Sequence, residues 1–284
     1  MFRKLTEPEF EKYAEFAYEL ALDLSHASFP VYTDGIKTKS DFIEQARASF
    51  SRRDEEILLF ERNGKTEGWI HYYRIDEDKY LGPHSILIKN GYAEALGELL
   101  EYWRAKFPGY SWHAYFPEKN REALSFMEKK GLSDPEPETV DVLFFEKYSP
   151  EPESENVIKI GPNNFDVFRK IHCKTDGDMY WNCDRIAQHL ADWSIFVYAE
   201  GGDPLGTIYY NGKGTADLEI FGIDYACGEF DPKITEALLI NCLNSAKECG
   251  AKSMYFFNDP ETHKIAEKLN FDYITTAYYF EGTV

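Results

Sequence analysis

The sequence predicts a two-domain α/β protein in which each domain has a mixed β-sheet with helices on both faces. Three observations support this fold class: the length, an order of elements that occurs twice, and a polar segment between the two copies. A chain of 284 residues suits about two domains of the usual size. The composition is 43% hydrophobic and 16% aromatic, which supplies enough apolar side chains for two cores.

The internal repeat is visible in landmarks that recur at a nearly constant spacing. Three residues of a predicted hairpin have counterparts at one constant distance along the sequence. Three residues of later elements have counterparts at a distance that is one residue longer. The six pairs are Ile57 and Ile195, Gly64 and Gly202, Gly68 and Gly206, Leu99 and Leu238, Asn120 and Asp259, and Leu132 and Phe271. Because so regular a set is hard to produce by chance, we interpret the chain as one fold used twice.

Each element of the first copy follows from its local pattern. Apolar residues three and four apart predict helices, and Asn63-Gly64 between two apolar segments is a strong signal for a β-hairpin. Ser40 is the expected N-cap of the second helix, and Gly131 is expected to end the last one. The predicted elements are a strand at 2–5, helices at 7–24 and 40–50, a hairpin of 56–62 and 66–73, a strand at 85–88, a helix at 92–107, a strand at 110–115, a helix at 120–129 and a strand at 139–147.

The second copy repeats this order after a linker. Residues 149–156 (SPEPESEN) are Pro, Ser and Glu with nothing to bury, so the predicted domains are 1–148 and 157–284. Asp231-Pro232 and Asp259-Pro260 each open a helix, with Asp as the N-cap and Pro at the first helical position. The predicted elements are a strand at 157–160, helices at 163–174 and 182–190, a hairpin of 195–199 and 205–210, a strand at 215–223, a helix at 232–249, a strand at 252–257 and a helix from 260.

The charge balance limits the classes of partner. A formal net charge of −19 argues against nucleic-acid binding, which needs a basic face. The charge is compatible with a cationic amine substrate, although a solvated acidic surface is the simpler explanation. No run approaches the ~18 apolar residues of a membrane span, and the N-terminal stretch lacks the apolar core of a secretory signal. We therefore expect a cytoplasmic protein with no membrane partner, of an oligomeric state that the sequence does not indicate.

The spacing of cysteines and histidines predicts no metal site. None of the five cysteines has a partner at the two-residue spacing of zinc knuckles and redox motifs. Cys242 and Cys249 fall on the apolar stripe of a predicted helix, whereas Cys227 lies in the loop before that helix with no neighbouring histidine. The seven histidines show no ligand-like spacing, and each is more simply explained as structural: His26, His71, His84, His113, His172, His189 and His263.

The last helix of each half carries the most specific motif. In the first half it comprises Asn120, Ala123, Phe126, Met127, Gly131 and Leu132. In the second half it comprises Asp259, Thr262, Ile265, Ala266, Asn270 and Phe271. Together with the repeat and the element order, this motif resembles the GCN5-related N-acetyltransferase (GNAT) family over essentially the whole chain. The resemblance implies two acyl-CoA N-acyltransferase (GNAT-like) domains in tandem.

The resemblance also implies a site for acetyl-CoA as co-substrate, without a metal. In this family the fourth and fifth strands diverge, and the pantetheine arm binds backbone groups of the fourth strand. A glycine-rich loop at the start of the next helix holds the pyrophosphate. Carried over to the second half, cofactor contacts would lie at Phe221 and Ile223 of the strand, Gly228 and Lys233 of the loop and helix start, and Asp259 at the last helix.

The second-half loop departs from the family pattern. Residues 225–232 (YACGEFDP) contain one glycine, and Pro232 has no N–H to offer an anion. Asp231, if it caps the helix, competes with phosphate for the remaining N–H groups, and only Lys233 could offset the acidic charge. The site would therefore be weakened or altered.

The first half has still less of this loop. The stretch between Ile88 and Leu99 is shorter than the matching stretch between Ile223 and Leu238, and Asn90-Gly91 is all that remains of the loop. We therefore expect the first half to be non-catalytic and only the second half to bind acetyl-CoA.

Candidate catalytic groups are few. A Tyr on the last helix is often the acid in this family, but the matching positions are Met127 and Ala266. Tyr255 is an alternative source of that proton. Glu219 is the candidate base, since several family members carry a Glu on the fourth strand.

Strand alternation places Glu219 on one face with Phe221 and Ile223, where apolar neighbours would raise the pKa of its carboxyl. The alternative is a strand glutamate that faces solvent or pairs with a Lys or Arg.

The acceptor side would come from residues 176–182 (DGDMYWN). Tyr180 and Trp181 beside Asp176 and Asp178 would suit a cationic or aromatic amine. Alternatively, Trp181 fills the core and the aspartates form the turn.

Two functions remain open at this point. One is an N-acetyltransferase that transfers an acyl group from acetyl-CoA to an amine of a small molecule or peptide. The other is a non-catalytic ligand-binding or scaffold protein of the same fold, since a fold does not fix chemistry. Stabilisation by acetyl-CoA would distinguish them.

Overall fold

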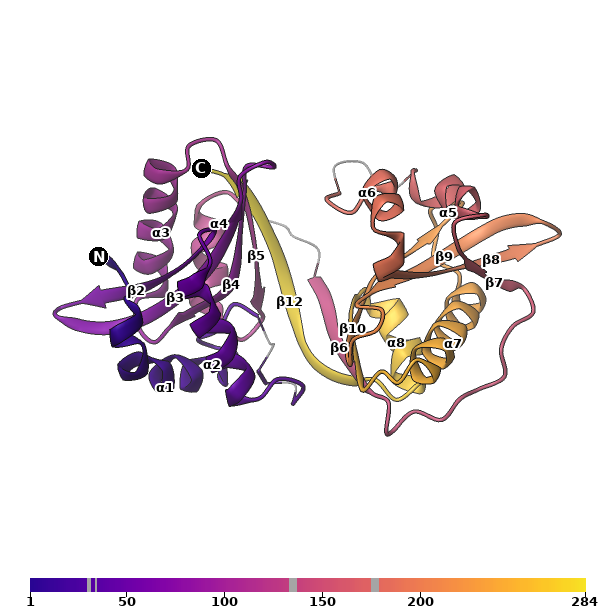
Figure 1. Cartoon of the computed structure of the whole chain (residues 1–284), viewed down its shortest axis with the longest axis horizontal. Coiled ribbons are helices and arrows are strands. Elements are labelled where there is room, and N and C mark those ends of the chain that lie inside the picture. The colour runs from indigo at the N-terminus through magenta and orange to yellow at the C-terminus, as the bar shows by residue number, and fades with distance from the viewer. Residues whose placement is uncertain (30–31, 34, 133–136, 175–178) are drawn as a thin grey trace. The chain divides into compact units, whose positions relative to one another are not determined.

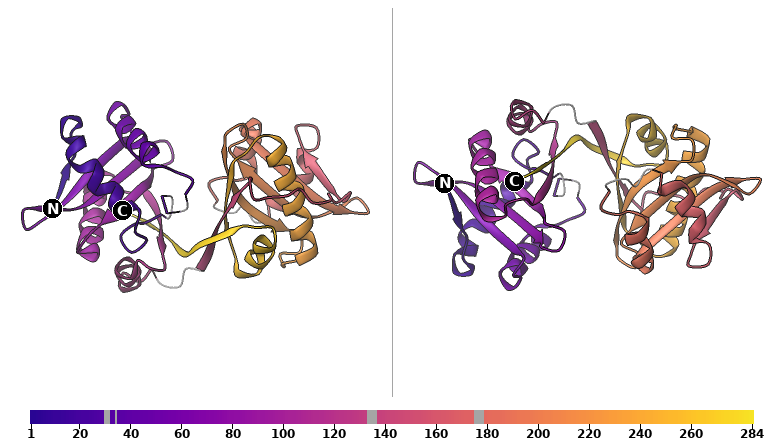
Figure 2. Two further views of the ribbon diagram at one scale, coloured as in Figure 1. Left: turned by 90° about the horizontal axis from the view of Figure 1, so that it is seen from below. Right: turned by 90° about the horizontal axis from the view of Figure 1, so that it is seen from above.

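The computed structural model describes residues 1–29, 32–33, 35–132, 137–174 and 179–284. The chain forms two compact units (Figure 1). The first unit contains Met1–Glu138 and Ile274–Val284, and the second contains Thr139–Tyr273. Each unit has helices on both faces of its sheet (Figure 2), as the fold class predicts.

The sheet of the first unit has the strand order β1-β2-β3-β4-β5-β12. Its pairs are antiparallel except for β4 and β5, which are parallel. Asn63 and Gly64, both with positive φ, close the β2–β3 hairpin as predicted. The strands are β1 (Phe2–Lys4), β2 (Glu55–Arg62), β3 (Lys65–Ile75), β4 (Tyr80–Ile88), β5 (Ser111–Pro117) and β12 (Asp272–Thr283).

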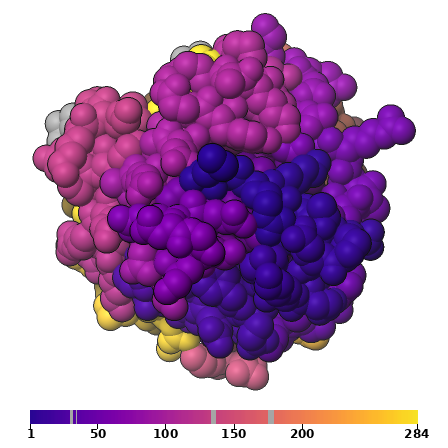
Figure 3. Space-filling view, turned by 90° about the vertical axis from the view of Figure 1, so that its left-hand side faces the viewer, coloured from indigo at the N-terminus to yellow at the C-terminus, as the bar shows by residue number. Residues whose placement is uncertain are grey.

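The helices of the first unit bury two separate cores. Phe10 of α1 and Phe42 of α2 pack with Trp69 on one face of the sheet, and Trp103 of α3 packs with Tyr72 on the other. Figure 3 shows the indigo N-terminal residues at the surface of this unit. The helical elements are η1 (Glu7–Glu9), α1 (Phe10–Ala21), α2 (Lys39–Ala48), η2 (Ser49–Ser51), α3 (Tyr92–Lys106) and α4 (Arg121–Lys129).

The sheet of the second unit has the strand order β6-β11-β10-β9-β8-β7. Again one pair is parallel, β10 with β11, and the others are antiparallel. The strands are β6 (Pro137–Phe144), β7 (Val157–Ile160), β8 (Trp193–Glu200), β9 (Asp203–Asn211), β10 (Asp217–Tyr225) and β11 (Ser253–Asn258).

The helices of the second unit also cover both faces of its sheet. α5 and α6 pack on one face with Trp193 and Tyr209, and α7 and α8 pack on the other with Leu218 and Ile220. Asp231 and Asp259 cap α7 and α8, as the Asp-Pro pairs predict. The helical elements are α5 (Phe165–His172), α6 (Cys183–Gln188), η3 (Leu190–Asp192), α7 (Pro232–Glu248) and α8 (Pro260–Lys268).

The compact units differ from the predicted ranges 1–148 and 157–284 in their closing strands. β6 follows α4 in sequence, yet it pairs with β11 in the second unit, where Val142 lies opposite Tyr255. β12 follows α8, yet it pairs with β5 in the first unit, where Tyr279 lies opposite Tyr115. A closing strand offers the same backbone groups and the same alternation to either copy, so its local pattern does not choose the partner.

Two local predictions for the first unit differ from the structure. Thr38, not Ser40, caps α2, because Thr38 and Asp41 form a reciprocal capping box. β4 begins at Tyr80 rather than at residue 85, since residues 80–83 already pair with β3. Among the described helices, none has the length and apolar character that crossing a bilayer requires.

Candidate functional site

In the second unit, β10 and β11 pair at one end and then diverge. Their parallel ladder begins at Asp217 and Ser253 and ends at Ile220 and Phe256. Beyond it, within the described residues, neither a ladder nor an isolated bridge joins residues 221–225 to a segment other than β9. We call this region the β10–β11 fork. Backbone groups of Phe221, Gly222 and Ile223 on this edge lie outside any ladder with a described strand, and such groups can hydrogen-bond an extended ligand.

Glu219 and Tyr255 lie side by side just before the fork. They are opposite each other in the parallel ladder, so their side chains point to the same face of the sheet. Glu219 is partly buried, and the Tyr255 hydroxyl is buried without a hydrogen-bond partner among the described residues. The structure thus places a carboxyl group next to a phenol group, the two candidates that the sequence analysis identified separately.

A β-bulge at Phe221 changes the strand alternation expected from the sequence. Ile220 pairs with Tyr210 and Gly222 pairs with Tyr209, which leaves Phe221 as the extra residue. Phe221 therefore packs on the α5–α6 face, 5.0 Å from Trp193 between ring centroids.

Ile223 packs against the opposite core, with Leu218 and Ile220. The expectation that Ile223 shares a face with Glu219 and Phe221 is wrong, because the bulge inverts the alternation beyond it.

The start of α7, where the family loop would hold a pyrophosphate, is occupied by the chain's own carboxylate. Asp231 Oδ1 accepts hydrogen bonds from the amides of Lys233 at 2.9 Å and Ile234 at 3.2 Å. The Lys233 ammonium lies 2.7 Å from a carboxylate oxygen of Glu200, a hydrogen bond that raises the pKa of Lys233. Gly228 is left-handed, with φ +77°, and its amide turns back to the carbonyl of Tyr225.

Asp259 likewise serves the helix that it begins. Its Oδ1 accepts from the amides of Glu261 at 2.8 Å and Thr262 at 2.9 Å, and its Oδ2 accepts from the Thr262 hydroxyl at 2.6 Å. The two candidate cofactor contacts at helix starts, Lys233 and Asp259, therefore both take part in helix capping.

The aromatic pair predicted for the acceptor side is split between surface and core. Tyr180 is 41% exposed, and the Arg185 guanidinium lies 4.0 Å from its ring centroid. Trp181 packs 5.2 Å from Trp193, against the core beneath α5 and α6. Trp181 thus fills the core, as the alternative interpretation expected, whereas the role of Tyr180 in binding the acceptor stays a prediction. Asp176 and Asp178 lie outside the described residues.

A buried histidine–carboxylate contact joins α5 to β10 beside the fork. His172 Nδ1 lies 2.8 Å from Asp224 Oδ2, and His172 Nε2 lies 3.1 Å from the carbonyl oxygen of Trp181. Both ring nitrogens therefore lie within hydrogen-bond distance of acceptor oxygens. The sequence analysis missed this pair, because the two residues are far apart in sequence and lie on different elements.

The corresponding fork of the first unit, between β4 and β5, is filled by the chain itself. β4 and β5 pair only over their first two residues. Residues 26–28 then lie beside β4. The amide of Ser28 donates to the carbonyl of Ile86, and the amide of Ile88 donates to the carbonyl of His26, both at 3.0 Å.

Two further contacts fix residues 26–28 in the first unit. Ala27 forms an isolated antiparallel bridge with Leu87, and its carbonyl accepts from the side chain of Asn120 at 3.0 Å. Ala27 and Asn120 are both fully buried. An extended ligand therefore has no free edge of β4 to bind at this point.

A polar cluster lies on the α1–α2 face of the first unit. Glu55 of β2, His71 of β3 and His84 of β4 bring one ligand-type atom each within 4.8 Å of the others. Burial opposes the charge on Glu55, but hydrogen bonds from His71 and Arg52 outweigh it and lower the pKa of Glu55 to about 2. Burial lowers the pKa of His84 to about 4. Histidine spacing does not reveal this cluster, because strand register assembles it.

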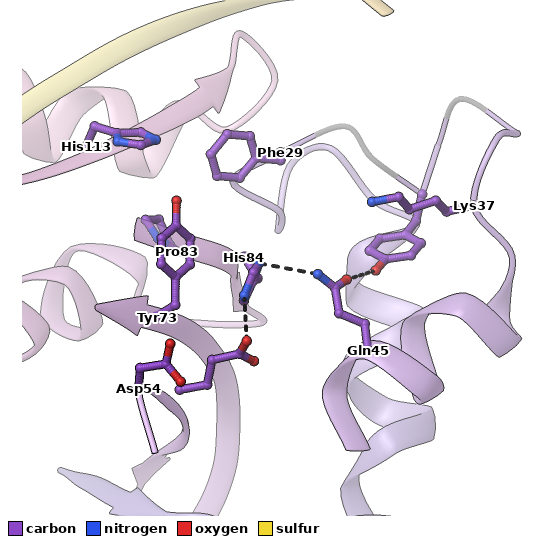
Figure 4. A pocket seen from close by; sticks show the side chains of 10 residues that line it. Phe29, Lys37, Gln45, Asp54, Tyr73, Pro83, His84 and His113 are labelled. Carbon is purple, nitrogen blue, oxygen red and sulfur yellow. Dashed lines mark hydrogen bonds and ion pairs between the residues drawn. The ribbon is translucent and has the colours of Figure 1, made fainter. Parts of the chain in front are cut away.

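The cluster borders a cavity of about 470 Å³ (Figure 4). Figure 4 shows His84 between the carboxylate below it and Gln45, with His113 and Tyr73 on one side and Lys37 on the other. The cavity is lined by Phe29, Tyr32, Lys37, Gln45, Asp54, Glu55, Tyr73, Pro83, His84 and His113.

Known structures share this architecture across the whole chain. A GCN5-related N-acetyltransferase from Sphaerobacter thermophilus superposes with a TM-score of 0.64 at 11% identity, covering 100% of this chain and 95% of that one. A tandem GNAT protein from the clavulanic acid biosynthesis pathway superposes with a TM-score of 0.54 at 12% identity, covering 100% and 98%. A putative acetyltransferase from Pyrococcus horikoshii gives 0.52 at 11% identity, covering 100% and 89%.

The comparison by sequence gives no match. No protein-family model matches the chain, and no curated protein matches it. At these identities the structural likeness shows the fold, which is that of two GNAT domains in tandem.

Proposed function

We propose, from the tandem GNAT fold of this chain, that its second unit transfers the acetyl group of acetyl-CoA to an amine. The observation that supports this best is the β10–β11 fork, with Glu219 and Tyr255 paired at its base. The first unit would be non-catalytic, because residues 26–28 occupy its fork.

In this proposal the pantetheine arm hydrogen-bonds β10 at Phe221 and Ile223, beyond the end of the ladder with β11. Glu219 accepts a proton from the incoming amine, directly or through a water molecule, and the amine nitrogen attacks the thioester carbon. The carbon–sulfur bond breaks, and Tyr255 donates its phenolic proton to the departing thiolate. Atoms balance as an acetylated amine and free coenzyme A.

The acceptor would be an amine of a small molecule or peptide. The net charge of −19 favours a cation by long-range attraction. Tyr180 presents an exposed aromatic face that already holds the guanidinium of Arg185, so a cationic amine would replace or accompany that contact.

The start of α7 favours a second candidate, a non-catalytic ligand-binding or scaffold protein. The Asp231 carboxylate accepts hydrogen bonds from two backbone amides that a pyrophosphate would need. Pro232 has no N–H group, so a third donor is missing. A bound coenzyme A would have to displace the Asp231 carboxylate or place its pyrophosphate on the Gly228 turn.

The deciding experiment is a titration of the full chain with acetyl-CoA and with coenzyme A, followed by thiol release in the presence of a panel of small amines. Binding raises the free energy of unfolding by about 2.7 kcal/mol at a ligand concentration of 100 Kd. We expect Glu219→Gln to bind acetyl-CoA like the wild type while thiol release falls roughly 100-fold or more. Tyr255→Phe should lower kcat with unchanged affinity.

Glu248→Gln, at the exposed end of α7, is the matched control and should retain full activity. If neither form of the cofactor stabilises the wild type, the transferase proposal is wrong and the scaffold candidate stands. If Glu219→Gln turns over normally, the carboxylate is not the base.

A further inference from the structure

The two units carry different chemistry at three equivalent positions next to their fourth strands. Glu55 and Trp193 are equivalent because they are the first residues of β2 and β8, the opening strands of the two hairpins. His71 and Tyr209 are equivalent because strand register places them opposite the same repeat landmark, which is Ile57 in one unit and Ile195 in the other.

His84 corresponds to Phe221, because each is the extra residue of a β-bulge. In the first unit, His71 pairs with Ser85 and Tyr72 pairs with Pro83, which leaves His84 unpaired in the ladder. The bulge aims His84 toward the other two members of the cluster, as bulges beside functional sites often do.

In the second unit the equivalent positions form an aromatic cluster. The ring of Trp193 lies 5.9 Å from that of Tyr209 and 5.0 Å from that of Phe221, between centroids. Aromatic packing at these three positions is therefore sufficient for the fold. The first unit does not need a carboxylate and two imidazoles there for its architecture. Burying such groups carries a desolvation cost that packing alone does not justify.

We propose that Glu55, His71 and His84 bind a divalent transition-metal ion at the edge of the first unit's cavity. Metal bonds of about 2.1 Å require donor atoms about 3.0–3.4 Å apart. His71 Nε2 lies 2.9 Å from Glu55 Oε2, and His84 Nε2 lies 3.7 Å from Glu55 Oε1. One donor atom from each of the three residues lies within 4.8 Å of the others, so the side chains would move closer together around a bound ion.

The side chains are pre-formed for this role. Glu55 and His71 have side chains that are 6% and 4% exposed. His84 Nε2 is buried without a hydrogen-bond partner among the described residues. A metal ion placed between this nitrogen and the buried Glu55 carboxylate, 3.7 Å away, would give His84 Nε2 the bond that it lacks.

The outer contacts fit the same role. Gln45 lies 3.3 Å from His84 Nδ1 and accepts a hydrogen bond from Tyr32 at 3.1 Å, which orients the imidazole (Figure 4). In the structure the Gln45 amide nitrogen faces His84 Nδ1. When the amide turns over, its oxygen accepts the Nδ1 proton and its nitrogen donates to the Tyr32 hydroxyl, which leaves Nε2 with a lone pair for the metal. Arg52 contacts Glu55 but is 51% exposed, so it can swing away when an ion enters.

Two imidazoles and one carboxylate select the class of ion. This ligand set suits Zn²⁺, Co²⁺, Ni²⁺ or Fe²⁺ better than Mg²⁺ or Ca²⁺, which prefer oxygen ligands alone. Three protein ligands leave coordination positions open toward the cavity of about 470 Å³, where water or an anionic ligand would complete the shell.

The test uses the full chain, freed of metal by a chelator and titrated with CoCl₂ and ZnCl₂. We expect one equivalent of Co²⁺ to bind, with visible absorption bands, and Zn²⁺ to displace it. His84→Phe, which introduces the residue of the second unit, should weaken binding by more than about 100-fold. Gln45→Ala should weaken it by about 10–100-fold.

His189→Ala is the matched control, since His189 lies in the second unit and is half exposed. Glu55→Gln, which keeps the side-chain shape, provides a second test if His84→Phe fails to fold. The proposal is overturned if the wild type binds no stoichiometric Co²⁺, or if binding survives in Glu55→Gln or His84→Phe, or if the control loses it equally. Acetyl transfer is not part of this readout, so the outcome is independent of the proposed function.

Discussion

Within the described residues, the two forks differ in what lies beside the fourth strand of each unit. In the second unit, Phe221, Gly222 and Ile223 of β10 lie in no ladder on the β11 side within the described residues. In the first unit, residues 26–28 take the equivalent place beside β4 with backbone hydrogen bonds of 3.0 Å. A short segment of chain is thus enough to satisfy the groups that an extended cofactor would otherwise bind.

The helices beside the two forks also differ in the size of the side chains that fill each unit's interior. The repeat that matches Leu99 of α3 with Leu238 of α7 also matches Trp103 with Cys242, one helical turn further along, and both of these side chains are buried. The first unit therefore fills its interior with a large ring where the second has a small side chain. Three predictions, in decreasing order of expected effect, would break or sharpen this comparison.

The largest effect is expected from removing the ring in the first unit. Trp103→Ala should lower the free energy of unfolding by about 3–5 kcal/mol, because Trp103 is 1% exposed and packs edge-on against Tyr72 at 5.4 Å. Cys242→Ala, the matched change, should cost about 1 kcal/mol. Urea unfolding of both variants measures the difference. Equal losses would contradict the idea that the two cores rely on different packing.

A smaller effect is expected from releasing residues 26–28. Asn120→Ala removes the buried hydrogen bond to the Ala27 carbonyl and the cap of α4, for a combined cost of about 2–3 kcal/mol. Hydrogen exchange should accelerate at the amides of Ser28 and Ile88, which hold this segment to β4.

Asp259→Ala is the control for the first unit's fork. It removes a helix cap in the second unit and should leave exchange at Ser28 and Ile88 unchanged. Unchanged exchange in Asn120→Ala would show that residues 26–28 hold their place without that side chain.

The smallest effect is expected for the pH dependence of stability, to which His113 of the first unit should contribute. Burial lowers the pKa of His113 to about 4, against about 6.5 in an unfolded chain. Between pH 6.5 and 4 the unfolded chain binds a proton that the folded unit resists, so stability falls as the pH falls.

In His113→Phe, the loss of stability on acidification should be roughly 1–2 kcal/mol smaller than in the wild type, because solvent screens part of the pKa shift of His113. Thermal melts at pH 7 and pH 4.5 measure it. An identical pH dependence in wild type and variant would show that other groups carry the linkage.

The sequence predicted most elements because their signals are local. The Asn63-Gly64 turn and the Asp231 and Asp259 caps each depend on residues within a few positions, and each occurs in the structure as expected. The repeat spacing predicted one fold used twice for the same reason, since it compares one local pattern with another. The resemblance of the last-helix motif and the element order to the GNAT family predicted which fold it is, and the structural neighbours share that fold.

The candidate site was less accessible to sequence reasoning. Glu219 and Tyr255 were named as separate candidates, and only the parallel register of β10 and β11 places them together. The face assigned to Ile223 was wrong because a bulge adds one residue to the alternation, and no local signal marks it.

What the sequence by itself determined is the set of elements, their order and their duplication, because helix stripes, caps and tight turns depend on neighbours along the chain. Tertiary structure alone decided which closing strand pairs with which sheet, where residues 26–28 lie, and that Glu55, His71 and His84 meet. These outcomes depend on register between distant strands, where backbone groups are chemically identical and the choice lies in the packing of each unit as a whole.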